Sequence, residues 1–237
     1  MTTVRNPLPS RSSVSTRRRI MAFAAIGLVT VAGLQLRPGM AAESAVTIPP
    51  LAGGPAGEAA TAQTVVFAGG CFWGVQGVFQ HTRGVLQAVS GYAGGNKNTA
   101  SYEVVSSGLT GHAESVQITY DPKVVSYPQL LQIYFSVVHD PTELNRQGPD
   151  RGSQYRSGVF YHDEAQKQAA LDSKAAIDKS GQLKKPVVSE ITAAGPFTAA
   201  EDYHQKFYKK NPGHYYRYRT GCGRDARLEA LWGKATH

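Results

Sequence analysis

The stretch Phe67-Ala-Gly-Gly-Cys-Phe-Trp-Gly-Val-Gln76 joins a strand pattern to a helix pattern at a cysteine. The residues before it, Thr64 to Phe67, form a short apolar run of the kind found in buried strands. After it, apolar residues recur at helical spacing, at Phe72, Val75, Val78 and Phe79. The pair Gly69-Gly70 supplies the turn between the two elements. Cys71 is therefore predicted at or near the N-terminus of a helix.

This position has consequences for the chemistry of Cys71. Unpaired N–H groups and the helix dipole favour a thiolate at a helix N-terminus. The glycines around it allow another molecule to approach the sulfur closely. Phe72 and Trp73 add two aromatic faces, which suit a soft, apolar substrate group. The alternative is that Cys71 is a small buried core residue, as free cysteines often are.

Strand and helix patterns are intermixed along the rest of the chain, which predicts one α+β domain. Strands are expected at 64–68, 85–89, 114–120, 156–161 and 187–191, and helices at 71–80, 126–138, 163–179, 199–210 and 225–232. Ser126 with Gln129, and Thr198 with Glu201, have the spacing of capping boxes. Gly181 and Pro212 are predicted helix stops.

Glu114 opens the run Glu-Ser-Val-Gln-Ile-Thr-Tyr120 and shares its parity with Val116 and Ile118. Because alternate residues of a strand point to the same face, its carboxyl is predicted on the apolar side. Burial there raises the pKa of a carboxyl, which can then act as a general acid near neutral pH. The alternative is a strand-end glutamate that turns back to solvent.

The second of the two cysteines, Cys222, lies between glycines in Thr220-Gly-Cys-Gly223. Two cysteines in an exported protein could form one structural disulfide. The flanking glycines instead predict a mobile loop, which suits a sulfur that moves towards a partner and forms a bond that breaks in each turnover.

The segment GCFWG at 70–74 resembles the active-site motif of the A-type peptide methionine-sulfoxide reductases, which reduce the S epimer of methionine sulfoxide. The resemblance runs from about Val65 to about Pro212. It includes the blocks GYAGG (91–95), SYEVVSSGLTGHAE (101–114), YDP (120–122), HDPT (139–142), NRQGPDRGSQYRS (145–157) and AEDYHQKFYKKNP (200–212). It implies a ferredoxin-like two-layer α/β plait with extra loops, and we expect a loop-rich C-terminal tail.

The resemblance also assigns roles within these blocks. Tyr102 and Tyr155 match phenols that hydrogen-bond the sulfoxide oxygen, and Asp150 matches an acid that helps hold the substrate backbone. The substrate methyl group would lie against Phe72 and Trp73. His204 is interpreted as substrate-side support or as a structural histidine on a capped helix. Phe207 stands where a tyrosine is expected.

The expected reaction begins when Cys71 attacks the sulfoxide sulfur and Glu114 protonates the oxygen, which leaves a sulfenic acid on Cys71. A Cys71–Cys222 disulfide then forms, and a thioredoxin-type dithiol reduces it. The substrates are oxidised proteins and free methionine sulfoxide, and the protein is expected to be a monomer. We expect no cofactor and no metal, since neither His112 nor His139 belongs to a pair at ligand spacing.

Other functions remain possible from the residues alone. A cysteine hydrolase would need a histidine base, for which His112 and His204 are the candidates. A thiol peroxidase would use the same nucleophile without needing the aromatic residues. An exported binding domain with one structural disulfide is a third, non-enzymatic alternative.

The N-terminal part of the chain has the pattern of an export signal. Its first 42 residues hold six arginines and no acid, so the formal charge of +8 falls to +2 over the remainder, and nucleic-acid binding is not indicated. Arg17 to Arg19 precede an apolar run, Ile20 to Leu36, and small residues follow. We expect a signal peptide at 1–42 of the twin-arginine type, cleaved near Ala41 or Ala42, a flexible linker at 43–62, and a single catalytic domain at 63–237 located in the periplasm. An uncleaved membrane anchor is the alternative.

Overall fold

A computed structural model describes residues 62–232, so the predicted signal peptide and most of the predicted linker lie outside the described residues. The first part of the domain holds β1 (Gln63–Gly69), α1 (Phe72–Gln80), β2 (Val85–Ala93), β3 (Ala113–Tyr120), α3 (Tyr127–Ile133) with a π-helical turn, η2 (Tyr134–Val138), and β6 (Ser157–Tyr161). The later elements are α4 (Glu164–Ser180), β7 (Glu190–Ala193), β8 (Thr198–Ala199), α5 (Phe207–Lys210), α6 (Pro212–Gly221) and α7 (Arg224–Trp232).

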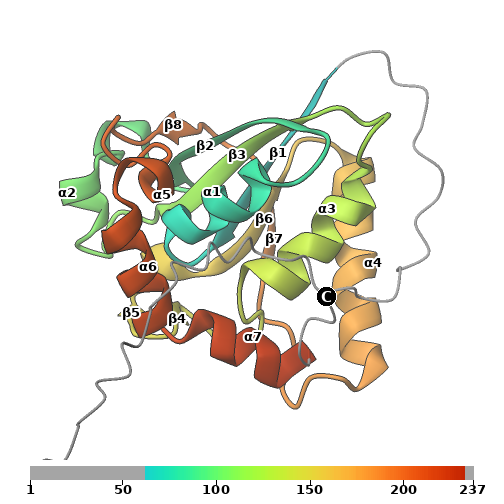
Figure 1. The fold of residues 1–237 in the computed structure, drawn as a ribbon. Helices are drawn as coiled ribbons and strands as arrows, with labels where there is room; N and C mark the ends of the chain where they lie inside the picture. The colour runs from blue at the N-terminus through green and yellow to red at the C-terminus, as the bar shows by residue number, and fades with distance from the viewer. Residues whose placement is uncertain (1–61, 233–237) are drawn as a thin grey trace, which may run out of the picture. The chain divides into compact units, whose positions relative to one another are not determined.

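The principal sheet has the strand order β7-β6-β1-β3-β2-β8. Its centre, β6-β1-β3-β2, is antiparallel throughout, while β7 adds in parallel to β6. With α1 between β1 and β2 and α3 between β3 and β6, this is the ferredoxin-like arrangement, with α1 and α3 on one face of the sheet (Figure 1). The predicted α+β plait is confirmed.

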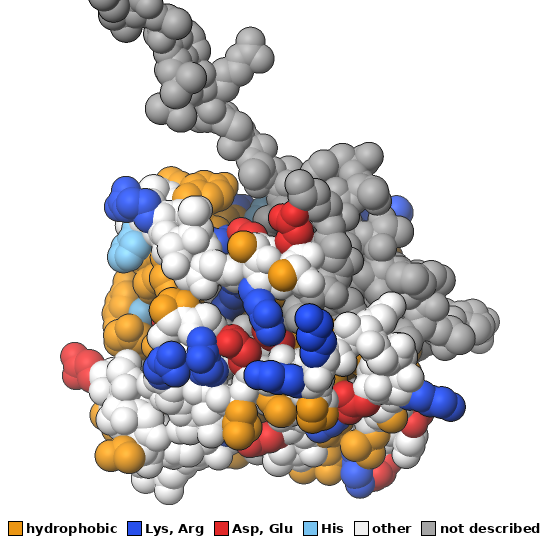
Figure 2. Space-filling model, turned by 90° about the horizontal axis from the view of Figure 1, so that it is seen from below, with side chains coloured by type: hydrophobic (Ala, Val, Ile, Leu, Met, Phe, Trp, Pro, Cys, Tyr) orange, Lys and Arg blue, Asp and Glu red, His pale blue; other side chains and the backbone are white. Residues whose placement is uncertain are grey.

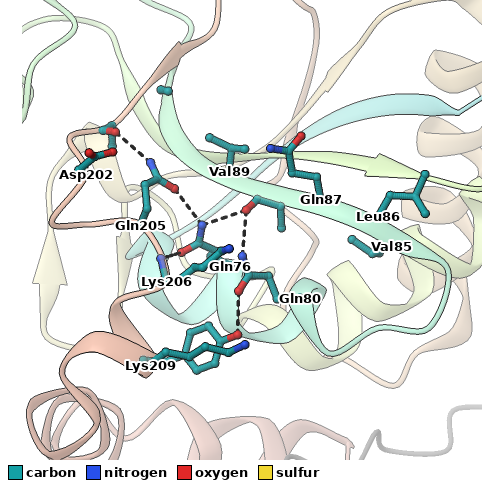
Figure 3. A pocket seen from close by; sticks show the side chains of 14 residues that line it. Gln76, Gln80, Val85, Leu86, Gln87, Val89, Asp202, Gln205, Lys206 and Lys209 are labelled. Atoms are coloured by element: carbon teal, nitrogen blue, oxygen red, sulfur yellow. Dashed lines mark hydrogen bonds between the residues drawn. The ribbon is translucent and has the colours of Figure 1, made fainter.

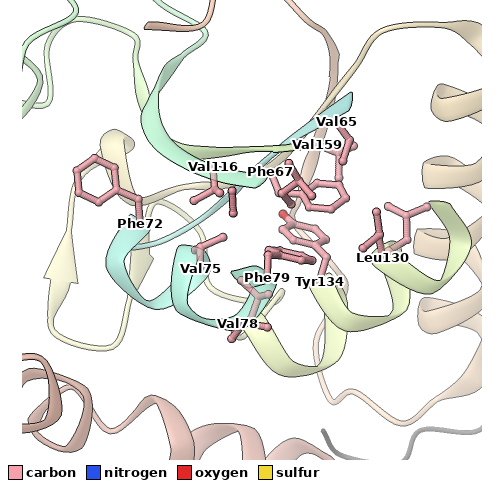
Figure 4. Packing of buried hydrophobic residues seen from close by; sticks show 14 of the residues in the cluster. Val65, Phe67, Phe72, Val75, Val78, Phe79, Val116, Leu130, Tyr134 and Val159 are labelled. Carbon is pink, nitrogen blue, oxygen red and sulfur yellow. The ribbon is translucent and has the colours of Figure 1, made fainter. Parts of the chain in front are cut away.

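The main hydrophobic core lies between the sheet and the helices (Figure 4). Alternate residues of β1 divide between the two faces, as strand geometry requires. Val65 and Phe67 join the main core, where the Phe67 ring stacks on Tyr134 at 4.7 Å between centroids. Val66 and Ala68 join a smaller cluster on the opposite face. Burial on both faces explains why β1 has a continuous apolar sequence rather than an alternating one.

Two of the predicted helix boundaries are confirmed by their capping contacts. Ser126 accepts a hydrogen bond from the backbone N–H of Gln129, and the Gln129 side chain accepts one from the Ser126 N–H, so the capping box is complete. Gly181 ends α4 in the left-handed conformation, with φ of 67°. Such a conformation is easiest for glycine because it has no Cβ.

The predicted helix at 199–210 is wrong. Thr198 pairs with Tyr92 as part of β8, residues 202–206 form turns, and only α5 is helical. Glu201 does not complete a capping box with Thr198, because its carboxylate binds Tyr92 and the N–H of Tyr102 instead. Lys206 has a positive φ of 53°, which is incompatible with a continuous helix.

In the tail, the helix predicted at 225–232 is confirmed as α7, whereas the part before it, which is predicted to be loop-rich, folds as the helix α6. Pro212 starts α6 rather than only ending a helix, since the first helical position needs no N–H from its residue. Cys222 is the C-terminal cap of α6, and Gly223, with φ of 67°, separates the two helices.

Several short elements around the site were not predicted: η1 (Lys97–Thr99), α2 (Tyr102–Val105), β4 (Arg146–Gln147), β5 (Asp150–Arg151) and η3 (Ser153–Tyr155). Each has two to four residues, which is too short for a periodic pattern. Within residues 62–232, none of the helices combines the length and the apolar character that a bilayer-spanning helix needs.

Candidate active site

Cys71 occupies the N-cap position of α1, as the sequence predicts, and is 7% exposed. Glu114 reaches it from β3: its Oε2 accepts a hydrogen bond of 3.0 Å from the backbone N–H of Phe72. This N–H belongs to the first turn of α1 and has no partner within the helix. The start of the helix therefore fixes the Glu114 carboxyl next to the residue that carries the sulfur.

The Glu114 carboxyl is buried, on the apolar side that its strand parity predicts. Burial raises its pKa from 4.5 to about 8, and the Phe72 N–H and the Arg224 guanidinium limit that rise. At neutral pH the group is therefore mainly protonated and can donate a proton.

The helix N-terminus is predicted to lower the pKa of the Cys71 thiol, but in the substrate-free protein other effects on this pKa are larger. Burial raises the pKa of Cys71 far above its ordinary value, and Glu114 raises it further. Arg224 and the Trp73 N–H act in the opposite direction without overcoming these effects. The thiol is thus protonated at rest, and the helix terminus alone does not make a thiolate.

Tyr102, Tyr155 and Asp150 face the same site, although they come from α2, η3 and β5. Burial raises the pKa of both phenols, and the next largest cause in each case is the charge on Glu114. Cys71 and Asp150 also act on both phenols. Two phenol donors therefore lie close to the protonated carboxyl of Glu114 and the thiol of Cys71.

Trp73 is held by two residues from the segment after β8. Its indole stacks flat on Phe207, with ring centroids 3.7 Å apart and an interplanar angle of 5°. Its Nε1–H donates a hydrogen bond of 2.9 Å to Nδ1 of His204. The His204 ring also contacts Phe72 and Tyr102, at centroid distances of 5.0 and 4.4 Å. His204 thus lies in a turn rather than on the predicted helix, and it supports both aromatic residues and one phenol.

Glu201 also belongs to the site, although the sequence pattern predicts it only as a helix-capping residue. Its Oε1 accepts from the backbone N–H of Tyr102 at 2.9 Å, and its Oε2 accepts from the Tyr92 hydroxyl at 2.8 Å. These bonds tie the first residue of α2 to β2. The sequence indicates a role for Glu201 at the site only through its location in the block AEDYHQKFYKKNP (200–212). Its spacing from Thr198 predicts a helix cap instead.

A polar cavity of about 460 Å³ lies beside this segment and contains neither Cys71 nor Glu114 (Figure 3). The buried amide of Gln76 on α1 donates to Ala88 O and to Gln205 Oε1, and accepts from the Lys206 N–H. Gln205 in turn bonds the N–H and the carbonyl of Ser90. These amides anchor the turn that carries His204, so this cavity lies next to the support of the site rather than at the reacting groups.

The tail packs over α1. Tyr218 donates to Asp150, and its ring meets Trp73 edge-on at 5.7 Å between centroids. Figure 2 looks onto the side where α6 and α7 lie in Figure 1, and there Lys and Arg side chains gather among acidic ones. Two of the ion pairs of this region join Arg219 to Asp225 and Arg227 to Asp140. No sequence pattern indicates that Tyr218 or the arginines of the tail belong to the site.

Both cysteines are free thiols in this structure. Cys222 is buried, and its Sγ donates to the Arg219 carbonyl at 3.1 Å. It lines a cavity of about 320 Å³ together with Gln147, Gly148 and Arg224. Gly148 lies close to it, since a Cβ at that position would be 2.5 Å from the Cys222 carbonyl oxygen. The tail therefore places Cys222 beside the loop that holds Gln147 and Gly148. In the same loop, the Gln147 side chain lies against Gly70.

The two histidines considered as hydrolase bases have other partners. His204 Nδ1 accepts from Trp73, and His112 Nε2 bonds the Asn96 carbonyl at 2.9 Å. Neither is among the groups that act on the Cys71 thiol. The geometry therefore favours attack by a thiol assisted by a carboxylic acid and phenols, which suits transfer of an oxygen atom from a neutral, polar group.

Comparison with known proteins agrees with this geometry. A sequence model described as peptide methionine sulfoxide reductase matches residues 63–236. Peptide methionine sulfoxide reductase MsrA 2 of Mesorhizobium japonicum is 53% identical over 170 residues, covering 72% of this chain and 87% of the relative. MsrA of Bacillus subtilis is 47% identical over 171 residues, covering 72% and 96%.

Solved structures show the same relationship. Methionine sulfoxide reductase A of Corynebacterium diphtheriae aligns with a TM-score of 0.61 at 31% identity, over 65% of this chain and 77% of the other. Mxr1 from Saccharomyces cerevisiae in its reduced form aligns with a TM-score of 0.60 at 34% identity, over 65% and 87%. The chain therefore belongs to the peptide methionine sulfoxide reductase family, in its A-type branch, and is an oxidoreductase that reduces methionine sulfoxide.

Proposed function

We propose that this enzyme reduces the S epimer of methionine sulfoxide, free or within oxidised proteins, and thereby repairs oxidatively damaged proteins. The observation that carries the proposal is the convergence on Glu114: its carboxyl binds the N–H of Phe72 next to Cys71, and its charge raises the pKa of Cys71, Tyr102 and Tyr155. The choice of the S epimer and the acceptance of both free and protein-bound substrate rest on family membership.

In the first step the Cys71 thiolate attacks the sulfoxide sulfur and forms a sulfur–sulfur bond to it, while the oxygen takes up a proton and the S–O bond breaks. The oxygen then transfers as hydroxide to the Cys71 sulfur, which becomes a sulfenic acid, and the sulfur–sulfur bond breaks with its electron pair on the departing methionine. Glu114 supplies a proton to the oxygen, and the phenols of Tyr102 and Tyr155 donate hydrogen bonds to it. The substrate methyl group lies against Phe72 and Trp73, and Asp150 holds the substrate backbone.

In the second step the Cys222 thiol attacks the sulfenic acid, which forms the Cys71–Cys222 disulfide and releases water. A thioredoxin-type dithiol then reduces this bond and is itself oxidised to a disulfide. The cavity of about 320 Å³ that Cys222 lines supports this step, because it leaves open space next to this residue.

The test is Cys71→Ser. This variant should not reduce a peptide that contains methionine S-sulfoxide when dithiothreitol is the reductant, while the folded protein is retained. Wild type should reduce the S epimer and leave the R epimer unchanged. Reduction at the wild-type rate by Cys71→Ser would contradict the assignment of the nucleophile. Glu114→Gln should keep part of the activity, because its amide and the two tyrosines still polarise the S–O bond.

We also propose that residues 1–42 direct export to the periplasm and are removed near Ala41 or Ala42, leaving a soluble monomer. Replacing Arg17, Arg18 and Arg19 with lysine should then block export, because a receptor reads the arginine pair rather than the charge alone. The mass of the mature N-terminus, measured in separated cell fractions, decides both cleavage and compartment. Normal export of the triple variant would favour the general secretory route.

A further inference from the structure

Arg224 is the first residue of α7, and its side chain is buried against the glycines that flank Cys71. A Cβ at Gly74 would lie 2.5 Å from its Nη1, and a Cβ at Gly70 would lie 3.0 Å from its Nη2. Nη1 also donates a hydrogen bond of 3.1 Å to the carbonyl of Val138. The guanidinium is thus fixed in direct contact with both sides of the segment that carries the nucleophile.

Two other arginines of the tail, Arg219 and Arg227, are each paired with a carboxylate, whereas Arg224 has no such partner among the described residues. Arg219 pairs with Asp225, with Nε 3.0 Å from Oδ1, and Arg227 pairs with Asp140 at 2.6 Å. Among the residues that the structure describes, no carboxylate forms an ion pair with Arg224. A buried guanidinium cannot release its proton, so a site without an opposing charge holds it at a cost.

The charged and titratable groups around Cys71 come from five other elements. Glu114 lies on β3 and Asp150 on β5, and the phenols are Tyr102 on α2, Tyr155 on η3 and Tyr218 on α6. Arg224 is the cation among the described groups that act on Cys71. Arg224 also lowers the pKa of Glu114, because its positive charge favours the ionised carboxylate.

We propose that Arg224 is a positioning residue that stabilises the single negative charge needed by the Cys71–Glu114 pair, and so prepares the thiolate for attack. The inference rests on the proposed function, which requires Cys71 to be ionised while Glu114 keeps its proton. In that state the pair carries one negative charge, and the guanidinium carries the charge that balances it. Asp150 opposes ionisation of Cys71, and the phenols, whose raised pKa values keep them neutral, supply no positive charge.

The position of Arg224 in the chain links this effect to the second sulfur. It follows Cys222 by two residues, and Gly223 forms the turn between them. One docked tail therefore supplies both the positive charge that favours the attacking thiolate and the thiol that later removes the sulfenic acid.

The experiment measures alkylation of Cys71 by iodoacetamide as a function of pH in the Cys222→Ser background. This reaction follows the thiolate and does not involve a sulfoxide, so it is informative even if the proposed function fails. Arg224→Gln should raise the apparent pKa of Cys71 by about one unit, which lowers the alkylation rate about 10-fold at every pH below that pKa. Arg224→Lys should restore part of the rate.

Two further variants separate this role from a structural one. Arg227→Gln removes one positive charge from the same helix and should leave the Cys71 profile unchanged. Gly74→Ala keeps the charge but places a methyl group against Nη1 of Arg224, and should shift the profile in the same direction as Arg224→Gln. Gly77→Ala is its control, because a Cβ there meets the Tyr215 hydroxyl rather than Arg224.

An alkylation profile that Arg224→Gln and Gly74→Ala both leave unchanged would overturn the inference. So would an equal shift caused by Arg227→Gln, since a general charge effect would then explain the result. If wild type fails to reduce methionine sulfoxide but the alkylation profiles behave as expected, the proposed function is wrong and the role of Arg224 stands.

Discussion

The indole N–H of Trp73 donates a hydrogen bond to Nδ1 of His204, 131 residues later in the chain. Because an indole N–H can only donate, Nδ1 must be the accepting nitrogen, and the proton of the neutral ring is on Nε2. Burial lowers the pKa of His204, which keeps this neutral form. The tautomer of this histidine is therefore fixed by a tryptophan of the site.

Trp73→Phe should keep an aromatic ring next to Phe207 but leave Nδ1 of His204 without its donor. We expect a loss of about 1–3 kcal/mol in the free energy of unfolding, because a buried acceptor is left unpaired. We also expect a higher KM, because the ring is no longer oriented. Urea unfolding and steady-state kinetics measure the two effects.

His204→Asn is the matched control for this prediction, because the Asn side-chain oxygen can occupy the place of Nδ1 and accept from the indole. It should retain more stability than His204→Ala. Equal stability of the two variants would show that the hydrogen bond contributes little.

Glu114→Gln should stabilise the protein at neutral and alkaline pH. The carboxyl has a pKa of about 8 in the folded protein against an ordinary value of 4.5, so the folded state binds more protons between these values, and stability falls as pH rises through this range. The amide has no such penalty and still accepts from the Phe72 N–H. The difference should be absent below about pH 4.5, grow up to about pH 8 to on the order of 5 kcal/mol, and then level off. Thermal unfolding across this range measures it, and a constant difference would be inconsistent with a buried, protonated carboxyl.

Cys222→Ser should complete one turnover and then stop with thioredoxin as reductant. It should release about one equivalent of methionine per enzyme, because the first step needs only Cys71. Dimedone should then trap the sulfenic acid, and mass spectrometry should locate the adduct at Cys71. Multiple turnovers with thioredoxin at the wild-type rate would remove Cys222 from the mechanism. A small thiol such as dithiothreitol is expected to restore part of the cycling.

Gly148→Ala should slow formation of the Cys71–Cys222 disulfide. Its φ of 57° disfavours a side chain, and the new Cβ would lie 2.5 Å from the carbonyl oxygen of Cys222. Gly181→Ala is the matched control: its φ is 67°, and nothing lies within 4 Å of the new Cβ. Both variants should lose about 1–2 kcal/mol of stability from backbone strain, and only Gly148→Ala should change the rate of disulfide formation after a single turnover. Equal rates in the two variants would show that this contact does not hold the tail.

The parts of the fold that the sequence predicts well are those whose signal is local. The Gly-Gly turn before Cys71, the parity of Glu114 and the complete capping box at Ser126 each depend on residues close together in the chain, and the structure places them as expected. The ferredoxin-like order followed from resemblance, because the intermixed patterns allow it without requiring it.

The errors arise where distant contacts decide the conformation. Glu201 has capping-box spacing from Thr198, but pairing of Thr198 with Tyr92 and the bonds of Glu201 to Tyr92 and Tyr102 prevent a helix there. Cys71 has the position of an activated thiol, yet burial and the proximity of Glu114 oppose ionisation, and neither is visible from the motif itself. Arg224 has no sequence signal of its own, because nothing near it in the chain indicates that its side chain packs against Gly70 and Gly74.

Two glycines lower the stability of the helix α1, and packing of the tail against them compensates for this loss. The helix has nine residues, and both Gly74 and Gly77 lie on the side where Arg224 and Tyr215 pack. Each glycine lowers helix stability by about 1 kcal/mol relative to alanine, so a short helix with two of them depends on its neighbours for its order. When the tail lifts, that side of α1 exposes backbone to water and its first turn should fray. The amide hydrogens of this turn should then exchange with solvent at a rate set by tail opening, and the helix that presents the nucleophile becomes a reporter of whether the second thiol is docked.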